Sequence, residues 1–122
     1  MDNVYRDRYF KTEYFKGLEE ISKVIREAYP EKAPTLRKFS SNYEFSRVEN
    51  NYFLAEAAYS WILHHSKLNG DLGDGMVLGA SSIRQLNSNL EMCQVAPLKP
   101  EVVEIFENVW LSTSHLCPSY LR

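Results

Sequence analysis

Residues 76–85, Met76-Val77-Leu78-Gly79-Ala80-Ser81-Ser82-Ile83-Arg84-Gln85, carry the strongest indication of fold class in the chain. Its first five residues are apolar at every position, which is typical of a strand buried on both faces. Ser82 followed three residues later by Gln85 fits a capping box, and the apolar spacing beyond it predicts a helix to about Gln94. A strand, a tight turn and a capped helix make half of a βαβ unit, so the sequence predicts an α/β fold.

Two helices are predicted upstream of this unit. Residues 11–29 carry apolar side chains at three- and four-residue spacings, with Thr12 as the expected N-cap and Pro30 as the stop. A second apolar stripe predicts a helix from about Tyr52 to Lys67, closed by Asn69-Gly70.

Downstream, Pro100 lies at a first-turn position before an apolar stripe that predicts a last helix over residues 102–115. The apolar residues between Glu31 and Asn50 follow neither a helical nor a strand periodicity, and the polar residues there indicate a loop. The sequence therefore predicts four helices and one strand. A single strand leaves two unpaired edges, so we expect the chain to be the end of a larger α/β protein.

Composition excludes several classes of protein. The chain has 122 residues, a formal net charge of -2 and no run of five like charges, which argues against a nucleic-acid partner. No apolar stretch approaches the ~20 residues that span a bilayer, and the first residues hold no export signal, so we expect a cytoplasmic protein without membrane contact. Cys93 and Cys117 lack metal-ligand spacing and are expected to be reduced structural thiols.

The adjacent histidines His64 and His65 are interpreted as structural or surface residues. Neighbouring positions on a helix point about 100° apart, and no further ligand stands at a helical spacing suited to zinc. We therefore expect no metal site.

The sequence resembles the C-terminal portion of the aflatoxin-aldehyde-reductase branch of the aldo-keto reductases. The resemblance rests on the following motifs, which occur in the family's order: Tyr5-Arg6-Asp7-Arg8-Tyr9-Phe10-Lys11, Trp61-Ile62-Leu63-His64-His65-Ser66, Gly73-Asp74, residues 77–86, Ser88-Asn89-Leu90, Pro97-Leu98, Pro100-Glu101-Val102-Val103 and Cys117-Pro118-Ser119-Tyr120-Leu121-Arg122. It implies that residues 1–122 are the C-terminal segment of a (β/α)8 barrel, mostly helical with one parallel-type strand and incomplete as a barrel on its own. Residues from about 30 to 52 depart from the family pattern and are expected to form an atypical, longer loop.

The resemblance also implies a cofactor site and a substrate site. A Gly-Ala-Ser-Ser turn before a helix offers N–H groups and hydroxyls to an anion. The family uses this segment to bind the 2′-phosphate of NADPH. The resemblance therefore implies that the cofactor is contacted by Gly79, Ala80, Ser81, Ser82, Gln85 and Asn89. The alternative is that Ser82 and Gln85 only cap their helix. Tyr5, Arg8 and Arg122 are implied to contact a substrate carboxylate, the alternative being solvated charges.

The catalytic residues of the family, an Asp-Tyr-Lys-His set, are expected to lie upstream of this chain. The chain alone is therefore predicted to be inactive and to bind NADPH weakly or not at all. In the complete enzyme, the resemblance implies NADPH-dependent reduction of small aldehydes or ketones to alcohols, and a homodimer. The alternative is a non-catalytic truncated isoform, acting as a helical binding module for a partner such as a full-length reductase subunit.

Overall fold

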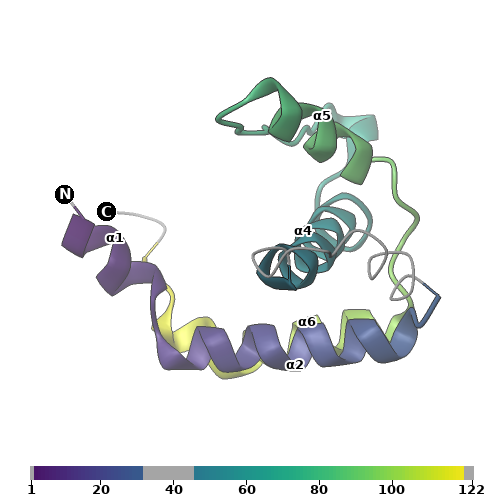
Figure 1. The fold of residues 1–122 in the computed structure, drawn as a ribbon. Helices are drawn as coiled ribbons and strands as arrows, with labels where there is room; N and C mark the ends of the chain where they lie inside the picture. Colours follow the sequence, from purple (N-terminus) through teal and green to yellow (C-terminus); the bar gives the residue numbers. More distant parts are fainter. Residues whose placement is uncertain (1, 32–45, 120–122) are drawn as a thin grey trace. The chain divides into compact units, whose positions relative to one another are not determined.

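The computed structural model describes residues 2–31 and 46–119, and this part of the chain is helical (Figure 1). Its α-helices are α1 (Asp2–Tyr9), α2 (Thr12–Ala28), α4 (Ser46–His65), α5 (Ile83–Met92) and α6 (Pro100–Thr113), with short 3₁₀ helices η1 (Gly70–Leu72) and η2 (Ser114–Leu116). The chain divides into two compact units, Met1–Arg37 with Pro100–Arg122, and Lys38–Lys99. The predicted helices at 11–29, 82–94 and 102–115 are confirmed to within two residues at each end.

In the first unit, α2 packs antiparallel against α6 (Figure 1). The buried stripe of α2 consists of Gly17, Ile21, Ile25 and Ala28, at the spacing that places side chains on one helical face. On α6, Val102 has no exposed surface. The two helices approach most closely at Gly17, where an added methyl group would stand 2.5 Å from Cγ1 of Val109.

The predicted N-cap of α2 is wrong by one residue. Lys11 is the N-cap, with extended backbone angles of φ -110° and ψ 142°, and its side chain caps no backbone N–H. The Lys11 carbonyl accepts the N–H groups of Tyr14 and Phe15, at 3.1 and 3.3 Å. Thr12 is already helical, so its hydroxyl is not in the position that caps a first turn. The helix ends as predicted, directly before Tyr29 and Pro30.

In the second unit, α4 begins at Ser46, inside the stretch predicted as a loop, and ends at His65. Residues 32–45 of that predicted loop lie outside the described part of the structure. Residues 46–51 contain no glycine or proline, so continuing the helix through them costs little even without an apolar stripe. Asn69 does not close this helix. Its side chain instead accepts the Asp71 N–H at 2.9 Å and caps η1, which ends at Gly73 with a left-handed φ of 83°.

Three side chains of α4 hold the segment that follows α5. Ser60 donates its hydroxyl to the Ala96 carbonyl, Nε2 of His64 lies 2.9 Å from the Val95 carbonyl oxygen, and Nε2 of His65 accepts the Leu98 N–H at 2.9 Å. Since an accepting Nε2 carries no hydrogen, His65 is in its Nδ1–H tautomer here. Both histidines therefore have structural roles, as the sequence predicted.

The strand predicted at Met76–Ala80 is not formed, and no residue of the described ranges lies in a β-strand. The segment is irregular, and Val77 is 97% exposed, although a strand buried on both faces was expected. A strand needs a neighbouring strand to pair its N–H and C=O groups. Residues 2–31 and 46–119 include no strand that could supply this pairing, so the segment stays irregular, with Val77, Gly79 and Ala80 exposed and Met76 and Leu78 partly covered.

Candidate functional site

The turn that precedes α5 is held in shape by two side chains of that helix. Ser82 has extended angles of φ -150° and ψ 158°, and its Oγ accepts the Gln85 N–H at 3.2 Å. Gln85 reaches back beyond the N-cap, and its Oε1 accepts both the N–H and the hydroxyl of Ser81, at 3.0 and 2.7 Å. The capping function of Ser82 is confirmed.

Asn89 extends this network to the start of the turn. Its Nδ2 donates to the Gly79 carbonyl at 3.2 Å, although the two residues are ten positions apart. The structure therefore brings all six residues predicted to contact the cofactor into one turn and the first two turns of α5, and residues 79–87 are exposed.

The chemistry of the turn suits an anion. The backbone N–H groups of Ser82, Ile83 and Arg84 donate no hydrogen bond to any described residue, because they precede the first donor of the helical ladder. They stand at the positive end of the helix dipole, beside the hydroxyls of Ser81 and Ser82. Such a combination of N–H groups, hydroxyls and dipole accommodates a phosphate group.

The predicted substrate residues are described only in part. Arg122 and the side chain of Tyr5 lie outside the described part of the structure. Arg8 is half-buried and lines a cavity of about 340 Å³, formed by α1 and the segment that follows α6; its lining residues are Val4, Asp7, Arg8, Lys11, Leu116 and Pro118.

Two contacts join the start of α2 to the same C-terminal segment. Nζ of Lys11 donates to the Leu116 carbonyl at 2.9 Å and lies 5.9 Å from the centre of the Tyr14 ring. The Tyr14 hydroxyl donates to Sγ of Cys117 at 3.7 Å. No role for Lys11 or Tyr14 was predicted from the sequence. The one feature of the sequence that could have pointed to Lys11 is its position three residues after Arg8.

Desolvation, and after it the hydrogen bond to the Cys117 thiol, raises the pKa of Tyr14 above its ordinary value of 10.0. A tyrosine that acts as a general acid near neutrality needs its pKa shifted toward the working pH. Tyr14 is shifted in the opposite direction, so it is poorly suited to donate a proton to a substrate.

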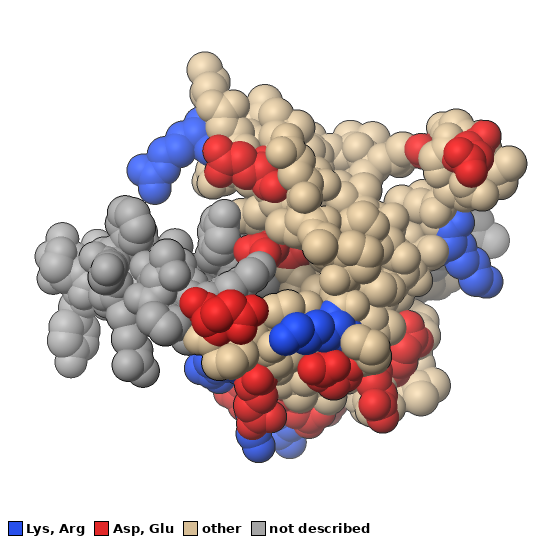
Figure 2. All heavy atoms as spheres, turned by 90° about the vertical axis from the view of Figure 1, so that its right-hand side faces the viewer, with Lys and Arg blue, Asp and Glu red and all other residues tan. Residues whose placement is uncertain are grey.

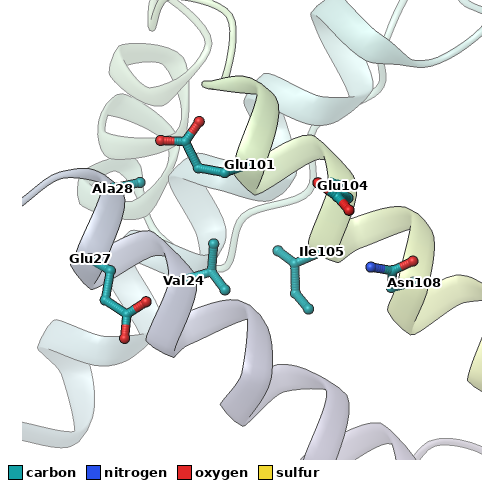
Figure 3. A pocket seen from close by; sticks show the side chains of 7 residues that line it. All are labelled: Val24, Glu27, Ala28, Glu101, Glu104, Ile105 and Asn108. Atoms are coloured by element: carbon teal, nitrogen blue, oxygen red, sulfur yellow. The ribbon is translucent and has the colours of Figure 1, made fainter.

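A second cavity, of about 410 Å³, lies between α2 and α6 (Figure 3). Val24 and Ile105 form its apolar floor, and it is flanked by three carboxylates, those of Glu27, Glu101 and Glu104. Acidic side chains, with some basic ones between them, gather over the α2–α6 unit in the lower part of the face in Figure 2.

No group of three or more potential metal ligands occurs among the described residues. Nor does any helix there have the length and apolar character needed to cross a membrane.

Comparison with known proteins identifies the family. The sequence profile of the aldo/keto reductase family matches residues 6–111. The chain belongs to this family. It is 34% identical over 119 residues to aldo-keto reductase family 7 member A3 of Homo sapiens, and the match covers 98% of this chain and 30% of that protein. It is also 34% identical over 118 residues to aflatoxin B1 aldehyde reductase member 2 of Rattus norvegicus, covering 97% of this chain and 27% of that protein.

These relatives place this aldo-keto reductase chain in the branch of the aflatoxin B1 aldehyde reductases. A shorter match, 46% identical over 66 residues, joins it to oxidoreductase sirO of Leptosphaeria maculans and covers 54% of this chain. The chain spans less than a third of the length of the relatives it matches from end to end. It therefore corresponds to part of the family's barrel fold, which accounts for the absence of a paired sheet among residues 2–31 and 46–119.

Proposed function

We propose that this chain is the C-terminal part of an NADPH-dependent aldo-keto reductase, which reduces aldehydes or ketones to alcohols. In this proposal it supplies the contacts to the 2′-phosphate of NADPH and to a carboxylate on the substrate. NADPH, when bound, supplies the hydride that reduces the carbonyl group. The observation that carries the proposal is the preformed turn at Gly79–Ser82, supported by the membership of the family.

The residues of the turn fit a phosphate group. At the start of α5, the backbone N–H groups of Ser82, Ile83 and Arg84 donate no hydrogen bond to a described residue. The hydroxyls of Ser81 and Ser82 lie beside them. Gln85 and Asn89 hold the turn through Ser81 and Gly79, so the donors are ordered before a ligand arrives. A preorganised site loses less conformational entropy on binding than a flexible one.

We further propose that the proton donor lies outside this chain. Tyr14 has a raised pKa and contacts Cys117 rather than an Asp-Lys-His set. The 122-residue chain alone should therefore reduce no aldehyde, and it should bind NADPH weakly or not at all. The remaining strands of a barrel would pair with residues 76–80 and cover the side chains of Val77 and Ile83, which are 97% and 80% exposed here.

The test is the affinity for NADPH of a reductase that carries this segment together with the catalytic part of the barrel. Asn89→Ala should raise the Kd for NADPH about fivefold, the effect of one lost hydrogen bond of about 1 kcal/mol, and should leave the Kd for NADH unchanged because NADH lacks the 2′-phosphate. Asn87→Ala, on the same helix and exposed, is the matched control. An equal loss for both cofactors would leave Asn89 with a purely structural role.

A further inference from the structure

The loop that follows α4 contains the one Asn-Gly pair of the sequence, Asn69-Gly70. Residues 69–75 are exposed, and the Gly70 N–H donates no hydrogen bond to a described residue. Asparagine is a thermolabile residue, because the backbone nitrogen of the next residue can attack its carboxamide carbon. A glycine in the next position has no Cβ to obstruct that attack.

In the folded turn, four hydrogen bonds fix the backbone and the side chain of Asn69. Its N–H donates to Oδ2 of Asp74 at 2.9 Å, and its Oδ1 accepts the Asp71 N–H, also at 2.9 Å. Its carbonyl oxygen accepts the N–H groups of Leu72 and Asp74, at 3.0 and 3.3 Å.

This conformation of Asn69 excludes attack by the Gly70 nitrogen. Ring closure requires that nitrogen to eclipse Cβ of Asn69 about the Cα–C bond. Since Cβ of an L-residue lies about 120° around this bond from the residue's own nitrogen, closure needs a ψ of about −120°. The observed ψ is 106°, so the bond must rotate by roughly 130°. That rotation turns the Asn69 carbonyl away from Leu72 and Asp74 and so opens the turn.

We propose that Asn69 is a site of spontaneous deamidation, and that the reaction proceeds only when the turn of residues 69–74 opens. In the open turn, the Gly70 nitrogen forms a bond to Cγ of Asn69. The proton of its N–H passes through water to the carboxamide nitrogen, which leaves as ammonia. Water then cleaves one of the two C–N bonds of the resulting succinimide ring, which leaves aspartate or isoaspartate at position 69. This inference does not depend on the proposed function.

The reaction changes the turn permanently. A carboxylate replaces the neutral carboxamide at a residue whose N–H is bound by the Asp74 carboxylate, and the two like charges repel each other. In isoaspartate the main chain also runs through Cβ, so the oxygen that accepts the Asp71 N–H is displaced. We therefore expect the isoaspartate form to lose the N-cap of η1, in the segment that leads to residues 76–80.

The experiment is incubation of the 122-residue chain at neutral pH in H₂¹⁸O, either folded or in urea, followed by mass spectrometry of the tryptic peptide of residues 68–84. Asn69 carries the one carboxamide of this peptide, so replacement of its nitrogen by ¹⁸O reports on Asn69 alone. We expect deamidation in urea, and a rate at least tenfold lower in the folded chain because several hydrogen bonds must break first.

Two variants and a matched control test the mechanism. Asp74→Ala removes the acceptor of the Asn69 N–H, and should speed deamidation of the folded chain about fivefold, the effect of one lost hydrogen bond. Asp71→Ala is the control, because it removes the same charge from the same turn while keeping the backbone N–H that Asn69 binds. Its rate should equal that of the wild type. Gly70→Ala should slow the reaction severalfold, folded or in urea, and its added Cβ would meet no atom within 4 Å.

Hydrogen exchange at the N–H groups of Asp71 and Leu72 separates opening of the turn from the chemical step. Asp74→Ala should speed this exchange by the same factor as deamidation, whereas Gly70→Ala should slow deamidation alone. The inference is wrong if Asn69 stays intact in urea, or if it reacts equally fast in the folded chain and in urea. Equal rates in folded Asp74→Ala and Asp71→Ala would also overturn it, since opening of the turn would then not set the rate.

Discussion

Replacing Gly17 by alanine should lower the free energy of unfolding of the α2–α6 unit. The added methyl group would stand 2.5 Å from Cγ1 of Val109, at least 1 Å closer than the usual carbon–carbon contact of about 3.5–4.0 Å. A valine in a helix has one strongly preferred rotamer, so Val109 cannot easily turn aside. The two helices would have to move apart along their buried stripe.

The magnitude follows from two opposing effects. Alanine is favoured over glycine inside a helix by about 1 kcal/mol, and overpacking a well-filled interface costs about 1–3 kcal/mol. We expect the second effect to exceed the first, with a net loss of about 1 kcal/mol. In a Val109→Ala background the obstructing methyl group is gone, and Gly17→Ala should then stabilise by about 1 kcal/mol.

The assay is denaturant unfolding followed by the fluorescence of Trp110, which lies on α6 and is 54% exposed. A Trp61→Phe background removes the signal of the other unit, since Trp61 lies on α4. Stabilisation of the unit by Gly17→Ala in both backgrounds would contradict a steric clash with Val109. The change would then reflect helix propensity alone, without a close approach at this position.

Two further predictions concern Tyr14 and His65. The pKa of Tyr14 is raised on folding, so the stability that the neutral Tyr14 side chain contributes is complete below its ordinary pKa of 10.0 and is lost as the pH rises through the folded pKa. Tyr14→Phe should therefore make the denaturation midpoint fall less steeply above about pH 10. An identical pH profile in the variant would contradict this prediction. His65→Leu should lower the free energy of unfolding by about 1–3 kcal/mol, because the Leu98 N–H loses its acceptor. Thermal unfolding followed by circular dichroism should show partial recovery in His65→Gln, and equal effects of the two variants would count against the hydrogen bond.

Features encoded by nearby residues were predictable from the sequence. Pro30 and Pro100 mark a helix end and a helix start because proline lacks a backbone N–H, an effect that needs no tertiary contact. The cap of α5 at Ser82 and Gln85 was predictable for the same reason. The candidate phosphate site lies within eleven consecutive residues, 79–89, so the sequence brings its members together without knowledge of the fold.

Features that depend on distant residues were not predictable in the same way. The apolar run at residues 76–80 has the composition of a buried strand, but strand formation depends on partners elsewhere in a sheet. The contact of Lys11 with Leu116 joins residues 105 positions apart, and no periodicity reveals such a pair. The early start of α4 escaped detection because its first turns carry no apolar stripe.

The antiparallel pairing of α2 with α6 has a consequence for synthesis of the chain on the ribosome. Lys11 and Leu116 are separated by 105 residues, and translation at about 5–20 residues per second makes one of them roughly 5–20 s before the other. During that interval Ile21 and Ile25 have no α6 to cover them. We therefore expect the nascent chain to interact with chaperones that bind apolar helices, until α6 has been synthesised and can pack against α2.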